Sequence, residues 1–191
     1  MDGFAAFWKD RGSDKGLGIA YAERPRSMTG ALRLDRIDLQ IMTQLQLNGR
    51  ITNLELAGKV GLSPSPCLMR VKRLEKGGYI AGYGARIELR RLGDTVTVFT
   101  EVTLSDHRSA DFAMFEARIR TITEITECYL VSGGYDYLLK FVIRSINHYQ
   151  ETIEDLLATG IGIAKYFSYV VIKPVFVKQY LELSAYFPTA E

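Results

Sequence analysis

From residue 34 onward, apolar side chains recur every three or four positions, which is the period of an amphipathic helix. Asp35 is placed to cap the first of these stripes and Asn48-Gly49 to end it, so the pattern predicts a helix over residues 35–47. The apolar positions of this stripe are Leu34, Ile37, Ile41 and Leu45.

Two further helices follow, each opened by its own start signal. Thr52-x-x-Glu55 is a capping box before the second helix, and Ser63-Pro64 places a capping hydroxyl and a first-turn proline before the third. The second stripe is Leu54, Ala57 and Val60, and the third is Cys67, Leu68, Val71 and Leu74, closed by Gly77-Gly78. Three short helices with a four-residue junction before the third predict a helix-turn-helix. Residues 79–83 and 86–89 then predict a small β ribbon, the wing of a winged helix.

Beyond residue 94 the period changes to two, which is typical of a strand with one buried face. The pattern predicts a strand over residues 96–104, a helix bearing Phe112, Phe115, Ile119 and Ile122, and a strand over 127–131. After a tight turn at residues 132–134 it predicts a strand over 136–143, a helix capped by Ser145 and ended by Gly160, and strands over 165–173 and 175–183. The order β-α-β-β-α-β with an appended strand is a ferredoxin-like unit, and the fold class is α+β.

This topology puts both helices on one face of an antiparallel sheet. The other face carries Phe99, and Tyr166, Phe167 and Tyr169 are available to it along the fourth strand. Because large exposed apolar patches usually mark a partner surface, we expect the sheets of two copies to pair.

The periods divide the chain into segments. Residues 1–33 show no sustained period and predict a mobile extension, with a short helix near residues 4–8. We expect a winged helix-turn-helix domain over residues 34–84, a hinge over 85–93 and the ferredoxin-like domain over 94–191.

The charge distribution separates the two domains further. The chain of 191 residues has a net charge of +2, but residues 31–93 carry eleven Lys and Arg against five Asp and Glu, whereas residues 94–191 carry eight against thirteen. The basic block suits a polyanion. Two cysteines 61 positions apart provide neither a disulfide framework nor a metal site, and we see no secretory signal or membrane span, so a cytoplasmic location is expected.

The third helix is the strongest candidate for function. Val71 and Leu74 fall on the side of Cys67, whereas the opposite side carries Ser65, Met69, Lys72 and Lys76, with Arg70 and Arg73 on the flanks. A helix with a narrow apolar back and a basic, hydrogen-bonding front suits the major groove of DNA, and its N-terminus suits phosphate. We find no catalytic constellation, and His107 and His148 are more typical of solvated surface residues, so an enzyme is not expected.

Five segments of the chain closely resemble the Lrp/AsnC (leucine-responsive/asparagine-responsive, "feast/famine") family of transcriptional regulators. They are residues 34–38 (LDRID), 49–57 (GRITNLELA), 60–75 (VGLSPSPCLMRVKRLE), 78–83 (GYIAGY) and 127–140 (ECYLVSGGYDYLLK). The resemblance implies a winged helix-turn-helix joined to a RAM-type ligand-sensing domain. It also implies a DNA-binding regulator of amino-acid metabolism without a cofactor, associated with the nucleoid. Its expected partners are double-stranded DNA, a small amino acid and further copies of the chain, as a homodimer assembling to an octamer.

The resemblance also implies site residues. The residues expected to contact DNA are Ser63, Ser65, Met69, Arg70 and Arg73, with Lys72 and Lys76 near phosphates; we add Thr52 and Asn53 at the start of the second helix. The residues expected around the amino acid, between subunits, are Ser132, Gly133, Gly134, Tyr135, Asp136 and Leu138, with Ser168 on the last long strand. Glycines allow a ligand carboxylate close to backbone N–H groups, and Asp136 offers a charge for an ammonium or braces the hairpin instead.

Two alternatives stay open at this point. One is an architectural protein that wraps DNA with weak sequence preference and needs no effector. A more distant one is an enzyme of amino-acid metabolism, since similar β-α-β-β-α-β modules accompany such enzymes. Salt-dependent DNA binding and an assay for turnover separate these classes.

Overall fold

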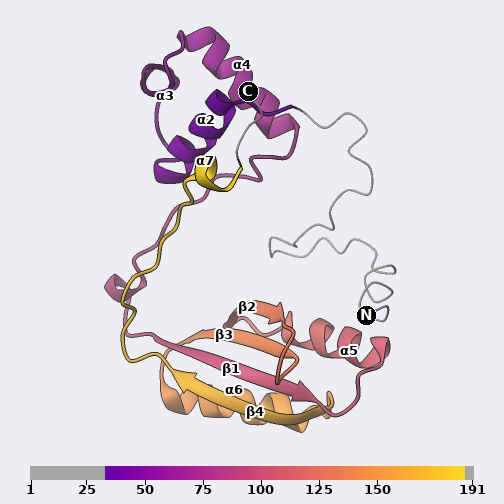
Figure 1. Cartoon of the computed structure of the whole chain (residues 1–191). Helices are drawn as coiled ribbons and strands as arrows, with labels where there is room; N and C mark the ends of the chain where they lie inside the picture. The colour runs from indigo at the N-terminus through magenta and orange to yellow at the C-terminus, as the bar shows by residue number, and fades with distance from the viewer. Residues whose placement is uncertain (1–32, 188–191) are drawn as a thin grey trace. The chain divides into compact units, whose positions relative to one another are not determined.

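The computed structural model describes residues 33–187, which form two compact units (Figure 1). The helical unit contains α2 (Arg36–Leu47), α3 (Asn53–Val60), α4 (Pro64–Lys76) and the short α7 (Leu183–Tyr186). Apart from Arg33, the extension expected over residues 1–33 and its short helix lie outside the described residues. Among the residues described, no helix is long and apolar enough to cross a bilayer.

The first two helices of the helical unit begin where the sequence predicts. Reciprocal capping boxes close the starts of α2, through Asp35 and Asp38, and of α3, through Thr52 and Glu55. The predicted capping by Ser63 is wrong, because its side chain makes no cap hydrogen bond although α4 begins at Pro64. Proline at this position has no N–H group to satisfy and already has the helical φ, which starts the helix without the hydroxyl.

The helical unit encloses a small core. Its buried cluster consists of Ile41, Leu56, Ala57, Val60, Cys67 and Leu74. The predicted positions of Leu54 and Leu68 are wrong, since these side chains are 71% and 42% exposed. In α3 the buried stripe starts at Leu56 instead, and the left-handed Gly61 (φ +70°) ends the helix before the turn into α4.

The predicted β ribbon after α4 is also wrong, because residues 77–95 contain no strand. The backbone N–H groups of Tyr79 and Ile80 instead donate to the carbonyl of Leu74, at 3.0 and 3.4 Å, and Gly78 adopts a left-handed conformation (φ +72°). The chain folds back over the end of α4, so Tyr79 and Ile80 pack against the helical core.

The sheet unit has the predicted β-α-β-β-α-β order. After a short 3-10 turn, η1 (Leu89–Arg91), its elements are β1 (Val96–Leu104), α5 (Ser109–Ile119), β2 (Ile125–Leu130), β3 (Tyr137–Ile143), α6 (Ile146–Ala158) and β4 (Ile163–Val170). The strands form one antiparallel sheet in the order β2-β3-β1-β4. Two predicted details shift: Ile122 lies beyond the end of α5, and β4 ends before Lys173.

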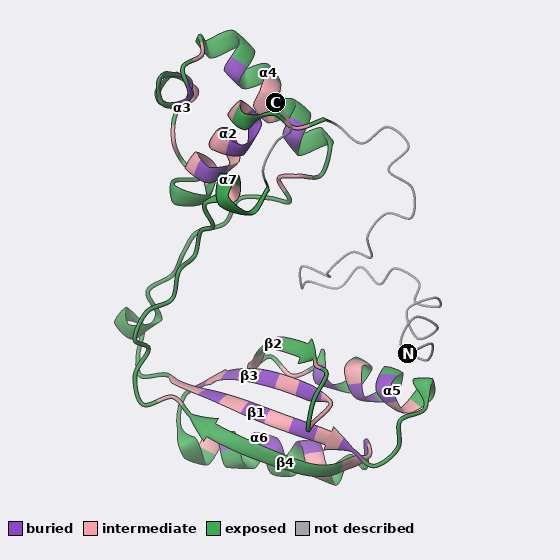
Figure 2. Ribbon diagram, in the orientation of Figure 1, coloured by how far each residue is buried: buried purple, intermediate pink, exposed green. Residues whose placement is uncertain are grey.

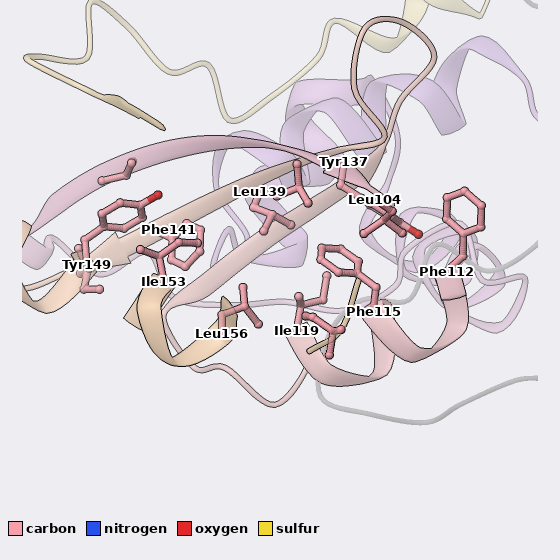
Figure 3. Packing of buried hydrophobic residues seen from close by; sticks show 14 residues of the cluster. Leu104, Phe112, Phe115, Ile119, Tyr137, Leu139, Phe141, Tyr149, Ile153 and Leu156 are labelled. Atoms are coloured by element: carbon pink, nitrogen blue, oxygen red, sulfur yellow. The ribbon is translucent and has the colours of Figure 1, made fainter. Parts of the chain in front are cut away.

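Both helices pack on one face of this sheet and build the larger core (Figure 3). On β1 and β3 buried residues alternate with less buried ones, and facing pairs such as Val98 and Phe141 are fully buried (Figure 2). Aromatic rings fill the space towards the helices, with Phe115 and Tyr137 at 4.6 Å between centroids. The hydroxyl of Tyr149 bonds to Thr100 (2.8 Å) and to Ser168.

The opposite surface, which we term the uncovered face, carries no helix from residues 33–187. Phe99 lies there, with Tyr169 directly across from it, and so does Phe167. These rings are accompanied by an ion pair between Lys140 and Glu127 (2.6 Å). The placement of Tyr166 on this face is wrong: Tyr166 lies across from the buried Val102 and therefore shares the face of the helices.

The predicted strand over residues 175–183 does not form. Residues 176–187 instead pack within the helical unit. The side-chain amide of Gln46 bonds to both backbone groups of Leu181, at 3.2 and 3.1 Å, and α7 packs against α2. A glutamine amide presents one donor and one acceptor as a peptide group does, so it binds an extended segment without a neighbouring strand.

Candidate nucleic-acid interface and ligand turn

Helix α4 presents the two-sided surface that the sequence predicts. Cys67 and Leu74 are fully buried against the helical core, and burial raises the pKa of the Cys67 thiol, which fits a structural role. The opposite side is exposed and consists of Ser65, Met69, Lys72 and Lys76. Two of these four side chains are cations, so the outward surface of α4 suits an anionic partner.

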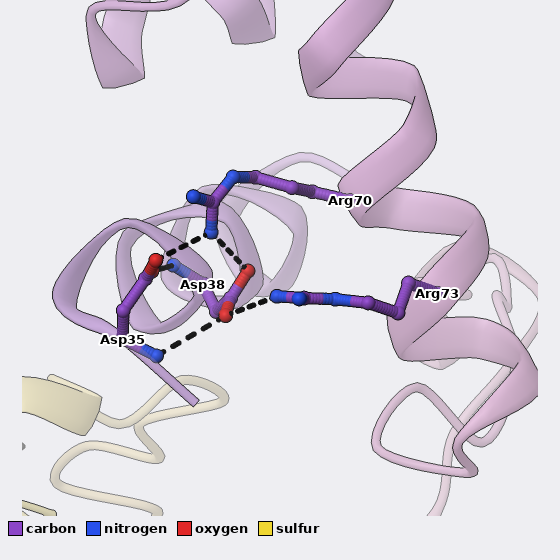
Figure 4. Close-up of polar contacts among 4 residues, drawn as sticks. All are labelled: Asp35, Asp38, Arg70 and Arg73. Carbon is purple, nitrogen blue, oxygen red and sulfur yellow. Dashed lines mark hydrogen bonds and ion pairs between the residues drawn. The ribbon is translucent and has the colours of Figure 1, made fainter. Parts of the chain in front are cut away.

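The two arginines on the flanks of α4 face α2 (Figure 4). Arg70 donates through Nη1 to Asp35 at 2.7 Å and to Asp38 at 2.8 Å, and Arg73 donates through Nη2 to Asp38 at 2.6 Å. The Asp38 side chain is fully buried. We name these four residues the aspartate–arginine brace, and it ties α4 to α2.

Charge pairing within the brace shifts the pKa values of Arg70 and Asp35. The pKa of Arg70 is raised by its hydrogen bond to Asp35, against the effect of burial, with Asp38 adding to the rise. Burial favours the neutral form of Asp35, but the Asp38 backbone N–H and the Arg70 guanidinium outweigh it and lower the pKa of Asp35. Both partners are therefore held in their charged forms.

The other residues expected at DNA lie at the junctions of the helices. The Thr52 hydroxyl makes two hydrogen bonds to Glu55. It accepts from the backbone N–H of Glu55 and donates to the Glu55 carboxylate. Asn53 donates to the carbonyl of Pro64 at 2.8 Å and so links the start of α3 to the start of α4. Ser63 is exposed at the N-terminus of α4, where backbone N–H groups lack helical partners.

The predicted ligand turn connects β2 to β3. Ser132, Gly133 and Gly134 are exposed there, Tyr135 is half-buried, and a side chain added at either glycine would meet nothing within 4 Å. Gly133 has φ +154°, a conformation that favours glycine. The turn therefore presents open backbone, which suits the approach of a small ligand.

Asp136 lies at the end of this turn, and its carboxylate already has hydrogen-bond partners within the chain. Its carboxylate accepts from the backbone N–H of Leu104 at 2.8 Å and lies 3.1 Å from Nε2 of His107. Its backbone N–H donates to Val102, and its carbonyl accepts from Val131, both at 2.9 Å. Of the two roles considered for Asp136, these contacts support that of a brace for the hairpin.

Leu138 and Ser168 complete the expected ligand set, but the sheet separates them. Leu138 lies across from Glu101 on the uncovered face, whereas Ser168 lies across from the buried Thr100 on the face of the helices. Within one chain these two side chains cannot line the same pocket. Residues 132–136 are therefore the part of the predicted set that the fold brings together.

Cavities lie elsewhere in the sheet unit. One of about 330 Å³ is formed by α6 and the segment that follows α5, and none of the expected ligand residues lines it. It contains the pair His148 and Glu124, 3.5 Å apart. No group of three potential metal ligands occurs in the part of the chain that the structure describes.

Sequence reasoning missed the acidic half of the brace. Asp35 and Asp38 are three positions apart, as are Arg70 and Arg73. Residues at this spacing share one side of a helix, so two such pairs of opposite charge on neighbouring helices are a readable signal for facing ion pairs. His107, the partner of Asp136, had no comparable signal, because neither residue belongs to a spaced pair of like charges on a helix.

The comparisons with known proteins agree with this architecture. Residues 34–81 match the model described as winged helix-turn-helix DNA-binding, and residues 97–181 match the Lrp/AsnC ligand binding domain. The chain is 45% identical over 144 residues to the transcriptional regulatory protein DoeX of Halomonas elongata, spanning 75% of this chain and 91% of that protein. It is 42% identical over 142 residues to the leucine-responsive regulatory protein of Escherichia coli, spanning 74% and 87%.

Solved structures show the same arrangement. A transcriptional regulator from Neisseria meningitidis, determined as an L-Met complex, superposes with a TM-score of 0.75 at 32% identity, over 81% of this chain and 99% of that one. An AsnC family regulator from Agrobacterium tumefaciens gives 0.76 at 28% identity, over 81% and 100%.

A helix-turn-helix unit joined to a sheet unit that matches a ligand binding domain defines a DNA-binding transcriptional regulator rather than an enzyme. The chain belongs to the Lrp/AsnC family of such regulators.

Proposed function

We propose that this protein binds specific sequences of double-stranded DNA through α4, and that a small amino acid bound between subunits modulates its assembly and its DNA affinity. The observation that carries the DNA-binding part is the exposed row Ser65, Met69, Lys72 and Lys76 on a helix whose opposite side is packed against α2 and α3. A helix held on one side and exposed on the other fits the major groove.

The roles of the α4 residues follow from their chemistry. Lys72 and Lys76 neutralise phosphates, and the Ser63 and Ser65 hydroxyls with the free N–H groups of the helix start bind a further phosphate. Met69, which is 67% exposed, offers an apolar contact to a thymine methyl group. Three further residues hold the helices of the interface in position rather than contacting DNA directly. They are Arg70, Thr52 and Asn53, whose side chains make hydrogen bonds between or within the helices.

The ligand is placed at residues 132–136, for which the exposed turn with Gly133 and Gly134 is the support. A ligand carboxylate can approach the backbone N–H groups there without a side chain in the way. The L-Met complex of the Neisseria relative supports an amino acid as the ligand class. In this reading Asp136 shapes the turn, and its partners are Leu104 and His107.

Assembly is placed at the uncovered face. The centre of this face is apolar and consists of Phe99, Phe167 and Tyr169. In a homodimer the same face of a second copy covers these side chains. Further pairing of dimers gives an octamer. Two α4 helices related by the dimer axis read half-sites about one helical turn of DNA apart. The amino acid changes DNA affinity by binding one assembly state more tightly than another.

The DNA part is tested with a pool of random duplexes enriched for binding. Affinity for the selected duplex and for random duplexes is measured from 50 to 300 mM salt, for the parent, Lys72→Ala, Lys76→Ala and the matched control Lys173→Ala, outside the helical unit. Each lost phosphate contact lowers the salt slope by about one unit. The control keeps the parent slope. Equal slopes in all four proteins contradict the placement of DNA on α4, and equal affinities of the parent for both duplexes favour a DNA-wrapping architectural protein.

The ligand part is tested by thermal shift with each of the twenty amino acids. A ligand present at 100 times its dissociation constant stabilises the native state by about 2.7 kcal/mol. Gly133→Val abolishes the shift if the turn is the site, because a β-branched side chain both fills the turn and disfavours its backbone. If Gly133→Val shows the same thermal shift as the parent, the amino acid binds outside this turn.

A further inference from the structure

Asp38 is a buried charge on α2, the helix that faces the two arginines of α4. It is the sole buried Asp, Glu, Lys, Arg or His side chain in residues 33–187. Each of its carboxylate oxygens accepts from a different guanidinium of α4, and the Asp35 backbone N–H donates to Oδ2 at 3.1 Å. A buried carboxylate is tolerated only with such partners, so the positions of both guanidiniums are coupled to Asp38.

The two guanidiniums are held differently (Figure 4). Arg70, with a side chain 26% exposed, bridges both aspartates. Arg73, with a side chain 41% exposed, contacts Asp38 through Nη2, its one hydrogen bond or ion pair to a side chain within residues 33–187. An arginine has five N–H donors, so Asp38 leaves four of those of Arg73 for another acceptor. Arg73 is thus anchored at one atom and open at the others.

The open side of Arg73 adjoins the outward surface of α4. Met69 precedes it by four positions and Lys76 follows it by three, and both are exposed. Side chains at these spacings are neighbours on one side of a helix. A ligand that covers Met69 and Lys76 therefore comes within reach of the Arg73 guanidinium.

We propose that Asp38 is a positioning residue for DNA recognition: it fixes the guanidinium of Arg73 so that its remaining N–H groups pair with the acceptor edge of a guanine. The inference rests on the proposed DNA binding by α4. A guanidinium already held in place has less conformational entropy to lose when it binds, and its planar fork matches the O6 and N7 acceptors of guanine. A mobile arginine would serve a phosphate of any sequence equally well.

The experiment measures the ratio of affinities for the selected duplex and for random duplexes. Arg73→Gln lowers this ratio roughly 5- to 150-fold, the range of one bidentate base contact. Arg73→Lys keeps the charge, and therefore the affinity for random duplexes, but it lowers the ratio because an ammonium lacks the fork. Asp38→Asn lowers the ratio without removing any group that touches DNA.

Two controls separate positioning from stability. Ile41→Ala opens a cavity in the core of the helical unit, so it lowers the melting temperature as Asp38→Asn does but leaves the affinity ratio within about twofold. In the double variant Asp38→Asn/Arg73→Gln, the ratio equals that of Arg73→Gln alone, because Asp38 acts only through Arg73. All affinities are measured at a temperature where amide exchange shows each variant folded.

Three results would overturn the inference: an unchanged ratio in Asp38→Asn, an equal loss of ratio in Ile41→Ala, or a further loss in the double variant. Each of them leaves the proposed function standing if the parent prefers the selected duplex and Lys76→Ala lowers the salt slope. Failure of those two measurements instead removes the proposed function itself.

Discussion

The two units of this protein are stabilised by different means. The sheet unit buries a cluster of fourteen apolar residues, with aromatic rings against its helices. The helical unit buries a cluster of six and adds the aspartate–arginine brace. A small core fixes the angle between two helices poorly, because few side chains interlock. We infer that charge pairing sets the orientation of α4 where apolar packing alone is too sparse.

The buried polar contacts of the two units differ accordingly. In the sheet unit Tyr149, Thr100 and Ser168 are neutral hydroxyls, which lose little when the pH or salt concentration changes. In the helical unit the buried contact is ionic. Within the brace, the pair of Arg70 with the half-exposed Asp35 is the one open to screening by salt, whereas the pairs with the buried Asp38 are screened much less.

The largest expected effect is in the sheet core. Phe115→Ala should lower the free energy of unfolding of the sheet unit by about 3–5 kcal/mol, because it removes a fully buried ring in contact with Tyr137. Native-state amide exchange reads each unit separately, and we expect the amides of α2, α3 and α4 to keep their protection. Equal loss of protection in both units would show that they unfold together.

Asp136→Ala should lower the free energy of unfolding of the sheet unit by about 1.5–3 kcal/mol in ligand-free protein. The Leu104 N–H and His107 lose their charged acceptor, and the hairpin loses its brace. Chemical denaturation measures the effect. His107→Gln is the control and should cost less, because the His107 side chain is 56% exposed. A variant as stable as the parent that no longer binds the amino acid would assign Asp136 to the ligand instead.

Two helix starts in the helical unit allow a matched comparison. Thr52→Ala should lower the free energy of unfolding by about 1 kcal/mol, since the Thr52 hydroxyl caps α3. Ser63→Ala should change it by less than about 0.5 kcal/mol, because Ser63 makes no cap bond to α4. Urea denaturation followed by amide NMR of the helical unit measures both. Equal effects would mean that Ser63 caps α4 in solution.

The smallest expected effect concerns acid. Because the pKa of Asp35 is lowered in the folded chain, its ionised form stabilises the helical unit above its unfolded pKa of about 4, and this contribution is lost as the pH falls through the lower, folded value. At pH 6 the parent should therefore be more stable than Asp35→Asn, and the difference should close below pH 4. A difference that persists at pH 2 would contradict ionic pairing of Asp35 with Arg70.

Local signals made most of the fold predictable. Capping residues placed the starts of α2, α3 and α6, and the period of two placed β1, because these features depend on residues a few positions apart. The strand over residues 175–183 failed for the opposite reason. The segment is rich in apolar residues, but the hydrogen-bond partner of its Leu181 is a glutamine side chain far away in the sequence.

The sequence was enough to predict which side of α4 faces outward, but not which way its two flanking arginines turn. A helical wheel separates the back of α4 from its front, whereas Arg70 and Arg73 fall on the flanks, where only the packing of α2 decides which way they turn. For Ser168, the pairing with the buried Thr100 decides the face of the sheet, and a pattern within one strand does not contain the register of its neighbour.

The contact between Gln46 and Leu181 affects how the protein forms during synthesis. The two residues are 135 positions apart, and a ribosome adds about 5–20 residues per second, so Gln46 is made roughly 7 to 27 s before its partner. The sheet unit, whose residues lie between them, can fold in that interval. The helical unit emerges first but is completed last, once the chain has returned to α2. A nascent chain therefore completes the packing around α2 only after the sheet unit has been made.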